Sequence, residues 1–394
     1  MATDARLERR LDEIRGGAPR RSPTVRVLAA YAQHTDCRLA ALGFAAGVNF
    51  DRLLTGTAFQ MPFGQSPFAI GRGLAFEKML RADHYAATLN LLRGLPHFPA
   101  TGARVVSLRE GYPSGPERMP LRARDTAALL ARIVRGDPSA PHLIDGAVLA
   151  ATIGGLRAYF EADALAALAG AELRVAEVKS FPKVDDRVDP DKLGAALDQV
   201  AVYILLTRDE VLRQGGDPER LVSDRALLIT PRNVGLTPTL SEQRVEARVR
   251  RARRLLDQIP RAADVAASVP AGVSFGTVAD TGVEERRRLD LLHDLADRVG
   301  TAYQPGCLAT CGNARFCRAR AFRDGSPCLA GTTALRLLPG VASLGRAEEL
   351  TRGARPAGEE APAAALLERA GRLYDTVGGG GGGAGPAPPA RRRA

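Results

Sequence analysis

The chain has 394 residues, of which 45% are hydrophobic and 25% are charged, a composition typical of a globular protein with a sizeable core. Its formal charge of +11 and its pI of about 9.9 favour an anionic partner, and nucleic acid is the commonest such partner. Residues 1–24 contain no apolar stretch, which predicts neither a secretory signal nor a membrane span. We therefore expect a cytoplasmic protein that does not associate with membranes.

The two ends of the chain are rich in residues that cannot build a core. Residues 16–22 consist mainly of Gly, Pro and Arg, and residues 378–394 of Gly, Pro, Ala and Arg. We expect disorder over 1–24 and over 378–394. Between these ends, we expect one folded domain over 25–335 and a helical extension over 336–377.

Helical and strand-like patterns follow one another in a definite order along the folded part. The predicted helices span residues 25–54, 71–92, 190–208 and 240–259. The predicted strands span residues 142–153, 156–168, 171–181 and 225–230. This order predicts an α/β fold with a core sheet flanked by helices.

The predicted strand 171–181 carries Glu177 and Lys179. Residues two apart on a strand point to the same face of the sheet. Metal-assisted cleavage of a phosphodiester needs carboxylates for hard cations and a positive group that steadies the attacking water or the developing charge. Asp163, one predicted hairpin earlier, would complete such a set, and Glu161 is the alternative with the same parity. Taken alone, Glu177 and Lys179 are also typical of a surface ion pair.

The predicted helix after this strand carries Gln199 and Tyr203. Residues four apart lie on one helical face, where an amide and a phenol could hydrogen-bond a phosphate, a water or the carboxylates. The spacing alone is common on ordinary helix surfaces. Its position, about twenty residues after Glu177 and Lys179, makes it informative.

Together these residues resemble the PD-(D/E)xK nuclease superfamily, in the RecB-like branch that includes CRISPR-associated adaptation nucleases and AddB-type repair nucleases. The resemblance covers about residues 25–329 and implies a restriction-endonuclease-like core sheet. It implies that Asp163 and Glu177 bind Mg²⁺ or Mn²⁺, and that Lys179 assists catalysis. It also implies that Gln199 and Tyr203 support the DNA backbone. The implied function is a metal-dependent nuclease acting on single-stranded DNA or duplex ends, in DNA repair or phage defence, with a helicase or defence complex as partner.

Members of this branch also carry an N-terminal motif with a glycine and often a histidine ahead of an acidic residue. The equivalent stretch here runs from Gly73 to Glu77, and Phe76 stands where the histidine is usual. Glu77 could replace it as a carboxylate ligand. His84 lies two turns further along the same predicted face, and we favour a structural role for it. The departure at Phe76 keeps open a catalytically silent DNA-binding scaffold subunit as the alternative function.

The cysteines form a second pattern. In a reducing compartment, closely spaced cysteines indicate metal ligands rather than disulfides. Iron–sulfur members of the RecB-like branch hold a [4Fe–4S] cluster with one cysteine before the nuclease core and three after it, which joins the two ends of the chain. The resemblance therefore implies a cluster on Cys37, Cys307, Cys311 and Cys317, although the Cys-x3-Cys-x5-Cys spacing departs from the usual Cys-x2-Cys-x5-Cys. The C-terminal cysteines alone, with Cys328 as the fourth, form an alternative set that suits zinc as well as iron.

Overall fold

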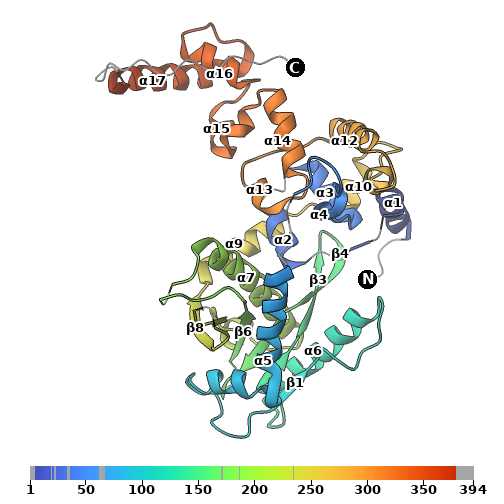
Figure 1. Cartoon of the computed structure of the whole chain (residues 1–394), viewed down its shortest axis with the longest axis vertical. Helices are drawn as coiled ribbons and strands as arrows, with labels where there is room; N and C mark the ends of the chain where they lie inside the picture. Colours follow the sequence, from blue (N-terminus) through green and yellow to red (C-terminus); the bar gives the residue numbers. More distant parts are fainter. Residues whose placement is uncertain are drawn as a thin grey trace. The chain divides into compact units, whose positions relative to one another are not determined.

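The computed structural model describes residues 5–18, 20–21, 24–32, 36–61, 67–169, 172–185, 187–233 and 235–378. The chain divides into two compact units, Met1–Thr301 and Ala302–Ala394, coloured along the sequence from blue to red in Figure 1. This division falls inside the range 25–335 that the sequence predicts as one domain. Of the predicted disordered tail 378–394, only Gly378 is among the described residues.

The described part of the first unit is built around a mixed six-stranded sheet. Its strands are β1 (Val105–Ser107), β2 (Leu143–Asp145), β5 (Ala164–Ala167), β6 (Leu173–Val178), β7 (Arg225–Pro231) and β8 (Pro238–Arg244). They lie in the order β1-β2-β5-β6-β7-β8, with β1 parallel to β2, β6 parallel to β7 and the other neighbours antiparallel. Strands β3 (Val148–Ile153) and β4 (Leu156–Glu161) pair with each other in a separate two-stranded sheet.

Helices cover both faces of the six-stranded sheet (Figure 1). They are α5 (Pro67–Leu92) on one face, and α6 (Arg118–Val134) and α7 (Pro190–Arg213) on the other, with α8 (Pro218–Leu221) and α9 (Glu246–Asp257) against α7. Strand β6 shows the two-residue alternation that this layering requires. Val175 packs in the core with α7, whereas Ala176 and Val178 pack in the cores under α5. The predicted α/β class, with a core sheet flanked by helices, is therefore confirmed.

Two of the predicted strands are each divided in the structure. The run 142–153 becomes β2 and β3, and the run 156–168 becomes β4 and β5. The chain leaves the large sheet at Gly146, whose φ of 68° favours glycine, and returns to it at Asp163. The Gly146 N–H donates to the Asp163 carbonyl at 2.8 Å, so the two breaks lie side by side. A strand-like pattern in the sequence does not reveal which sheet a strand joins, which is why the sequence-based prediction missed both breaks.

The prediction of a basic helix over 240–259 is wrong for the first residues of that range. These residues belong to β8, which pairs antiparallel with β7 along its whole length, from Arg244 opposite Arg225 to Pro238 opposite Pro231. The helix begins only at Glu246. Pairing with the edge of the sheet overrides the local helical pattern, because it satisfies the backbone groups of β7.

Helices from the two ends of the first unit pack against one another. They are α1 (Ala5–Arg15), α2 (Val25–Ala32), α3 (Arg38–Ala46), α4 (Phe50–Leu53), α10 (Ala262–Ala267), α11 (Gly276–Ala279) and α12 (Glu285–Val299). Arg288 of α12 is only 2% exposed and donates to three backbone carbonyls, at 2.9 Å to Leu53, 3.0 Å to Thr55 and 2.9 Å to Val278. This guanidinium therefore links α4, α11 and α12.

The N-terminal region differs from the sequence-based expectation in two ways. Helix α1 lies in the segment predicted to be disordered, because Leu11 and Ile14 form an apolar stripe that is fully buried. The predicted helix 25–54 is instead three helices. Gly47, with a φ of 68°, caps the C-terminus of α3, and the Asn49 side chain caps the N-terminus of α4.

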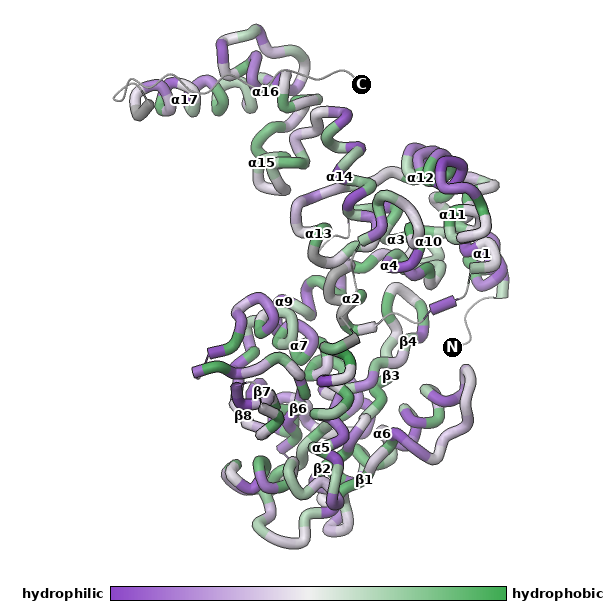
Figure 2. Tube along the Cα trace, viewed as in Figure 1, coloured by the Kyte–Doolittle hydropathy of each residue, from purple (hydrophilic) through white to green (hydrophobic). Residues whose placement is uncertain are grey.

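The described part of the second unit contains only helical segments. They are α13 (Cys307–Thr310), α14 (Ala314–Arg323), η2 (Pro327–Ala330), α15 (Thr332–Leu337), α16 (Leu344–Thr351), η3 (Gly358–Glu360) and α17 (Ala361–Gly378). Val341, Leu350 and Ala363 form part of a small core between α16 and α17. Figure 2 shows hydrophobic and hydrophilic residues alternating along α17, as expected for a helix with one apolar side. Among the described helices of the chain, none is long and apolar enough to cross a membrane.

Candidate active site

The structure brings Asp163 and Glu177 next to each other. Strands β5 and β6 pair with Ala164 opposite Ala176, so Asp163, directly before β5, lies beside Glu177 of β6. The backbone N–H of Val178 donates to Asp163 Oδ2 at 2.8 Å and fixes the direction of that carboxylate. Glu177 is 3% exposed, whereas Asp163 is partly exposed.

Lys179 connects this pair of carboxylates to the helix on the same face of the sheet. Its Nζ lies 2.6 Å from Glu177 Oε1 and donates to Gln199 Oε1 on α7 at 2.9 Å. Its backbone N–H donates to the Ile229 carbonyl at 3.0 Å and so continues the parallel pairing of β6 with β7. Because Glu177 is buried, the interpretation of Glu177 and Lys179 as a surface ion pair is wrong.

Burial makes both carboxylates harder to ionise. The pKa of Glu177 is raised to about 7, mainly by burial and also by the neighbouring Asp163, while Lys179 opposes the shift. Burial also raises the pKa of Asp163, against the hydrogen bond from Val178 and the charge of Lys179. Glu177 Oε2 is buried and has no hydrogen-bond partner within the described part of the chain. A buried, unpaired carboxylate oxygen beside a second carboxylate has the donor chemistry that a divalent cation requires.

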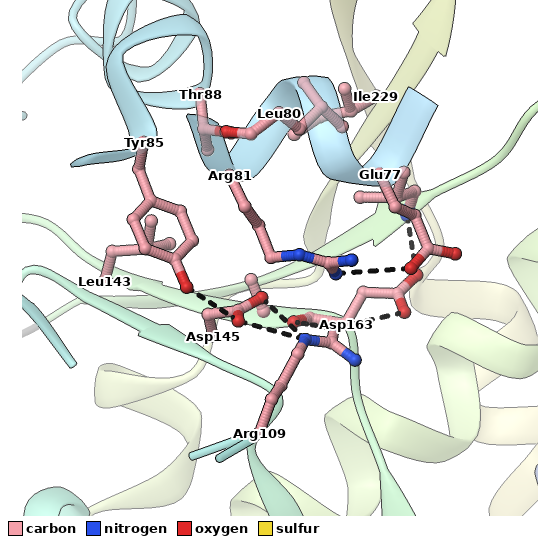
Figure 3. Close-up of a pocket in the computed structure, with 12 residues that line it drawn as sticks. Glu77, Leu80, Arg81, Tyr85, Thr88, Arg109, Leu143, Asp145, Asp163 and Ile229 are labelled. Atoms are coloured by element: carbon pink, nitrogen blue, oxygen red, sulfur yellow. Dashed lines mark hydrogen bonds and ion pairs between the residues drawn. The ribbon is translucent and has the colours of Figure 1, made fainter. Parts of the chain in front are cut away.

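Glu77 approaches Asp163 from the opposite face of the sheet. A cavity of about 30 Å³ separates α5 from the strands, and Glu77, Arg81, Asp145 and Asp163 contribute to its lining. Figure 3 shows the side chains of Glu77 and Arg81 extending from α5 toward the strands. Glu77 pairs with Arg81 at 3.2 Å and raises the pKa of Asp163. The structure therefore brings Glu77 near Asp163.

Phe76 and His84 lie outside this constellation. Phe76 is 0% exposed and packs against Leu80 and Ile229, so this side chain belongs to the core. The prediction that His84 shares a helical face with Glu77 is wrong, because α5 breaks at residues 82–85. His84 has a left-handed φ of 52° there and is exposed.

Tyr203 contacts the protein backbone rather than a neighbouring carboxylate oxygen. Its hydroxyl donates to the Glu161 carbonyl at 2.5 Å. Burial raises the pKa of this phenol, and the charges of Glu177, Asp163 and Glu161 raise it further. On α7, Gln199 thus contacts Lys179 while Tyr203 holds the strand that leads to Asp163.

Sequence reasoning missed a group of charged residues beside Asp163. Arg109, which follows β1, contacts Asp145, Glu161 and Asp163. Burial lowers its pKa, but the three carboxylates outweigh burial, and the net pKa is raised. The side chain of Glu161, the predicted alternative to Asp163, is engaged by Arg109 at 2.6 Å and by Arg122 at 2.7 Å. The one local signal that could have indicated this group is a charged residue at the end of an apolar strand, as at Asp145.

The predicted cysteine cluster is not seen in the described part of the chain. No group of three or more His, Cys, Asp or Glu residues there is arranged to hold a metal ion, and no described cysteine forms a disulfide. Cys37 belongs to the first unit and the other predicted ligands to the second, so their pairing stays a prediction. Within the second unit, Tyr303 has a pKa that is raised first by burial, against the charge of Arg318. The thiols that also raise it are those of Cys307, Cys317 and Cys328, which therefore lie near one phenol.

Comparisons with known proteins add no relative. No protein-family model matches the sequence, and no curated protein matches it. The case for a function therefore rests on the geometry of Asp163, Glu177 and Lys179.

Proposed function

We propose that this chain is a metal-dependent deoxyribonuclease of the RecB-like type, with a restriction-endonuclease-like core. One observation carries the proposal: Asp163, directly before β5, lies beside Glu177 of the neighbouring strand β6, and Lys179 joins Glu177 to Gln199. Ordinary surface ion pairs lack this combination of burial, register and a connected helix. The net charge of +11 supports DNA as the substrate.

Asp163 and Glu177 are the pair that would hold the cation; Glu77 would be a third carboxylate that has to move closer on binding, because no three such residues in the described part of the chain are already arranged as a metal site. The raised pKa of Glu177 and its unpaired buried oxygen support this assignment, because a divalent cation would neutralise both acids. When bound, Mg²⁺ or Mn²⁺ supplies Lewis-acid activation of water and stabilises charge on the phosphoryl oxygens.

Each protein group then has a distinct task. Lys179 holds its ammonium beside the carboxylates, where it orients the attacking water or stabilises the charge that develops on the phosphate. Gln199 fixes the direction of that ammonium through the bond at 2.9 Å. The Val178 N–H orients Asp163, and Tyr203 anchors the strand that precedes it.

The test is cleavage of end-labelled single-stranded and duplex DNA in Mg²⁺ or Mn²⁺. We expect cleavage by the wild-type chain and loss of cleavage in Lys179→Ala. Lys192→Ala is the matched control, because Lys192 is an exposed lysine in the first turn of α7 whose Nζ lies 3.7 Å from Asp189. Absence of cleavage in a wild-type protein that still binds DNA would favour the alternative, a catalytically silent scaffold subunit.

A metal cluster on the cysteines forms the second part of the proposal. We propose a [4Fe–4S] cluster, with zinc as the alternative metal. The proposed ligands are Cys37, Cys307, Cys311 and Cys317, and the four C-terminal cysteines, with Cys328 in place of Cys37, form the alternative set. Anaerobically purified protein is expected to contain about four iron atoms per chain. If the C-terminal set holds the cluster, Cys328→Ser will lose iron and Cys37→Ser will retain it; the reverse result would support the set that includes Cys37.

The proposed setting is the cytoplasm, in DNA repair or phage defence. A helicase or a defence complex is the proposed protein partner, because the substrate would then be the single strands or duplex ends that such machines produce. Co-purification with a helicase in the native host, measured with and without DNA, tests this part.

A further inference from the structure

Arg109 contacts acidic residues from two segments of the chain, Asp145 in one and Glu161 with Asp163 in the other. Its Nε donates to both carboxylate oxygens of Asp145, at 2.9 and 3.0 Å, and its Nη1 donates to Glu161 Oε1 at 2.6 Å. Its Nη2 donates to the backbone carbonyl of Asp163 at 3.2 Å and lies 3.9 Å from Asp163 Oδ1. Figure 3 shows Arg109 extending between Asp145 and Asp163. One guanidinium therefore contacts both the backbone and the side chain of a proposed cation ligand.

Asp145 and Glu161 each have other partners that would remain without Arg109. Asp145 also accepts hydrogen bonds from the hydroxyl of Tyr85 at 2.9 Å and from that of Ser107 at 3.1 Å. Glu161 also pairs with Arg122 at 2.7 Å. The specific contribution of Arg109 is therefore to connect these two acids to Asp163.

Asp163 lies at a position in the fold where local hydrogen bonds, rather than strand pairing, hold its backbone. Asp163 lies between β4 of the two-stranded sheet and β5 of the six-stranded sheet, and belongs to neither strand. Its carbonyl accepts from the Gly146 N–H at 2.8 Å and from Arg109. Because no strand ladder continues through this residue, its backbone is held by such local bonds, while its carboxylate accepts from the Val178 N–H at 2.8 Å and lies 3.9 Å from Arg109.

We propose that Arg109 is a positioning residue that orients Asp163 for cation binding, an inference that rests on the proposed nuclease function. The planar guanidinium carries five donors in a fixed fork, which is how it reaches three acidic residues at once. A lysine has one terminal nitrogen and retains the charge without the fork. Arg109→Lys therefore removes the contribution of Arg109 to the orientation of Asp163, keeps the hydrogen bond from the Val178 N–H, and leaves positive charge among the acids.

The experiment measures Mn²⁺ affinity directly, by calorimetric titration of the full chain without DNA. The variants are Arg109→Lys, Arg109→Gln, Asp163→Asn and the matched control Arg122→Lys. Arg122 contacts the same Glu161 but donates otherwise to the Gly146 carbonyl, at 2.8 Å, and not to Asp163. Thermal melts in EDTA confirm that each variant is folded at the titration temperature, and either Arg109 variant that is folded serves the test.

We expect Mn²⁺ binding by the wild-type chain, strong loss in Asp163→Asn, and a roughly 10- to 100-fold weaker affinity in the Arg109 variants. Arg122→Lys should bind within about twofold of wild type. Wild-type affinity in a folded Arg109 variant, with loss in Asp163→Asn, would overturn this inference and leave the proposed function intact. An equal loss in Arg122→Lys would also overturn it, because the network would then act only as a scaffold. A wild-type chain that binds no Mn²⁺ would refute the proposed metal-dependent function, and this inference with it.

Discussion

Replacing Glu177 by glutamine should stabilise the metal-free protein at alkaline pH. The folded-state pKa of Glu177 is raised from 4.5 to about 7, with burial as the main cause. Above pH 7 the folded chain must keep a buried charge that the unfolded chain exposes to water. The contribution of Glu177 to folding stability is therefore fully present below its pKa in the unfolded chain, 4.5, and is lost as the pH rises through its pKa in the folded chain, about 7.

The size of this effect follows from the two pKa values. At about 1.4 kcal/mol for each pH unit, their separation corresponds to at most about 3 kcal/mol. Part of that loss of stability has already occurred near pH 5. The free energy of unfolding should therefore fall by roughly 2 kcal/mol between about pH 5 and about pH 8.5. Glutamine has the shape of glutamate but does not ionise, so Glu177→Gln removes this change.

The assay is urea denaturation in EDTA at both pH values, followed by circular dichroism. We expect the stability gain of Glu177→Gln over wild type to be about 2 kcal/mol larger at the higher pH. Glu246→Gln, at an exposed position on α9, controls for general charge effects and should differ by no more than about 0.5 kcal/mol. A gain that is the same at both pH values would refute the assignment of a strained, ionisable Glu177. Added Mn²⁺ should reverse the order of stability, because wild type would bind it more tightly.

Three further substitutions test other parts of the structure. Tyr203→Phe removes the bond to the Glu161 carbonyl and should cost about 1 kcal/mol of unfolding free energy, with cleavage slowed rather than abolished; unchanged stability and kinetics would contradict the anchoring role. Phe76→His should destabilise the chain by at least about 2 kcal/mol without tightening Mn²⁺ binding, because this side chain lies in the core; tighter binding would show that the site can recruit a histidine. Arg288→Met leaves three backbone carbonyls without their donor and should cost about 3 kcal/mol or more in urea denaturation, and a loss below about 1 kcal/mol would contradict this account.

The sequence by itself determined the local part of the candidate site. Glu177 and Lys179 share a face because side chains alternate along a strand, and Gln199 and Tyr203 share a face because a helix repeats every 3.6 residues. It also indicated the order of helices and strands well enough to predict an α/β fold. These features depend on neighbours within a few residues, and a local pattern contains that information.

Only the tertiary structure decided what surrounds those residues. The breaks at Gly146 and Asp163 follow from the exchange between two sheets, and the break in α5 separates His84 from Glu77. Arg109 reaches Asp145 across 36 positions of sequence and Asp163 across 54. Such contacts depend on which strands become neighbours in the sheet. Strand order is set by the packing of the whole chain, so no local spacing could have predicted them.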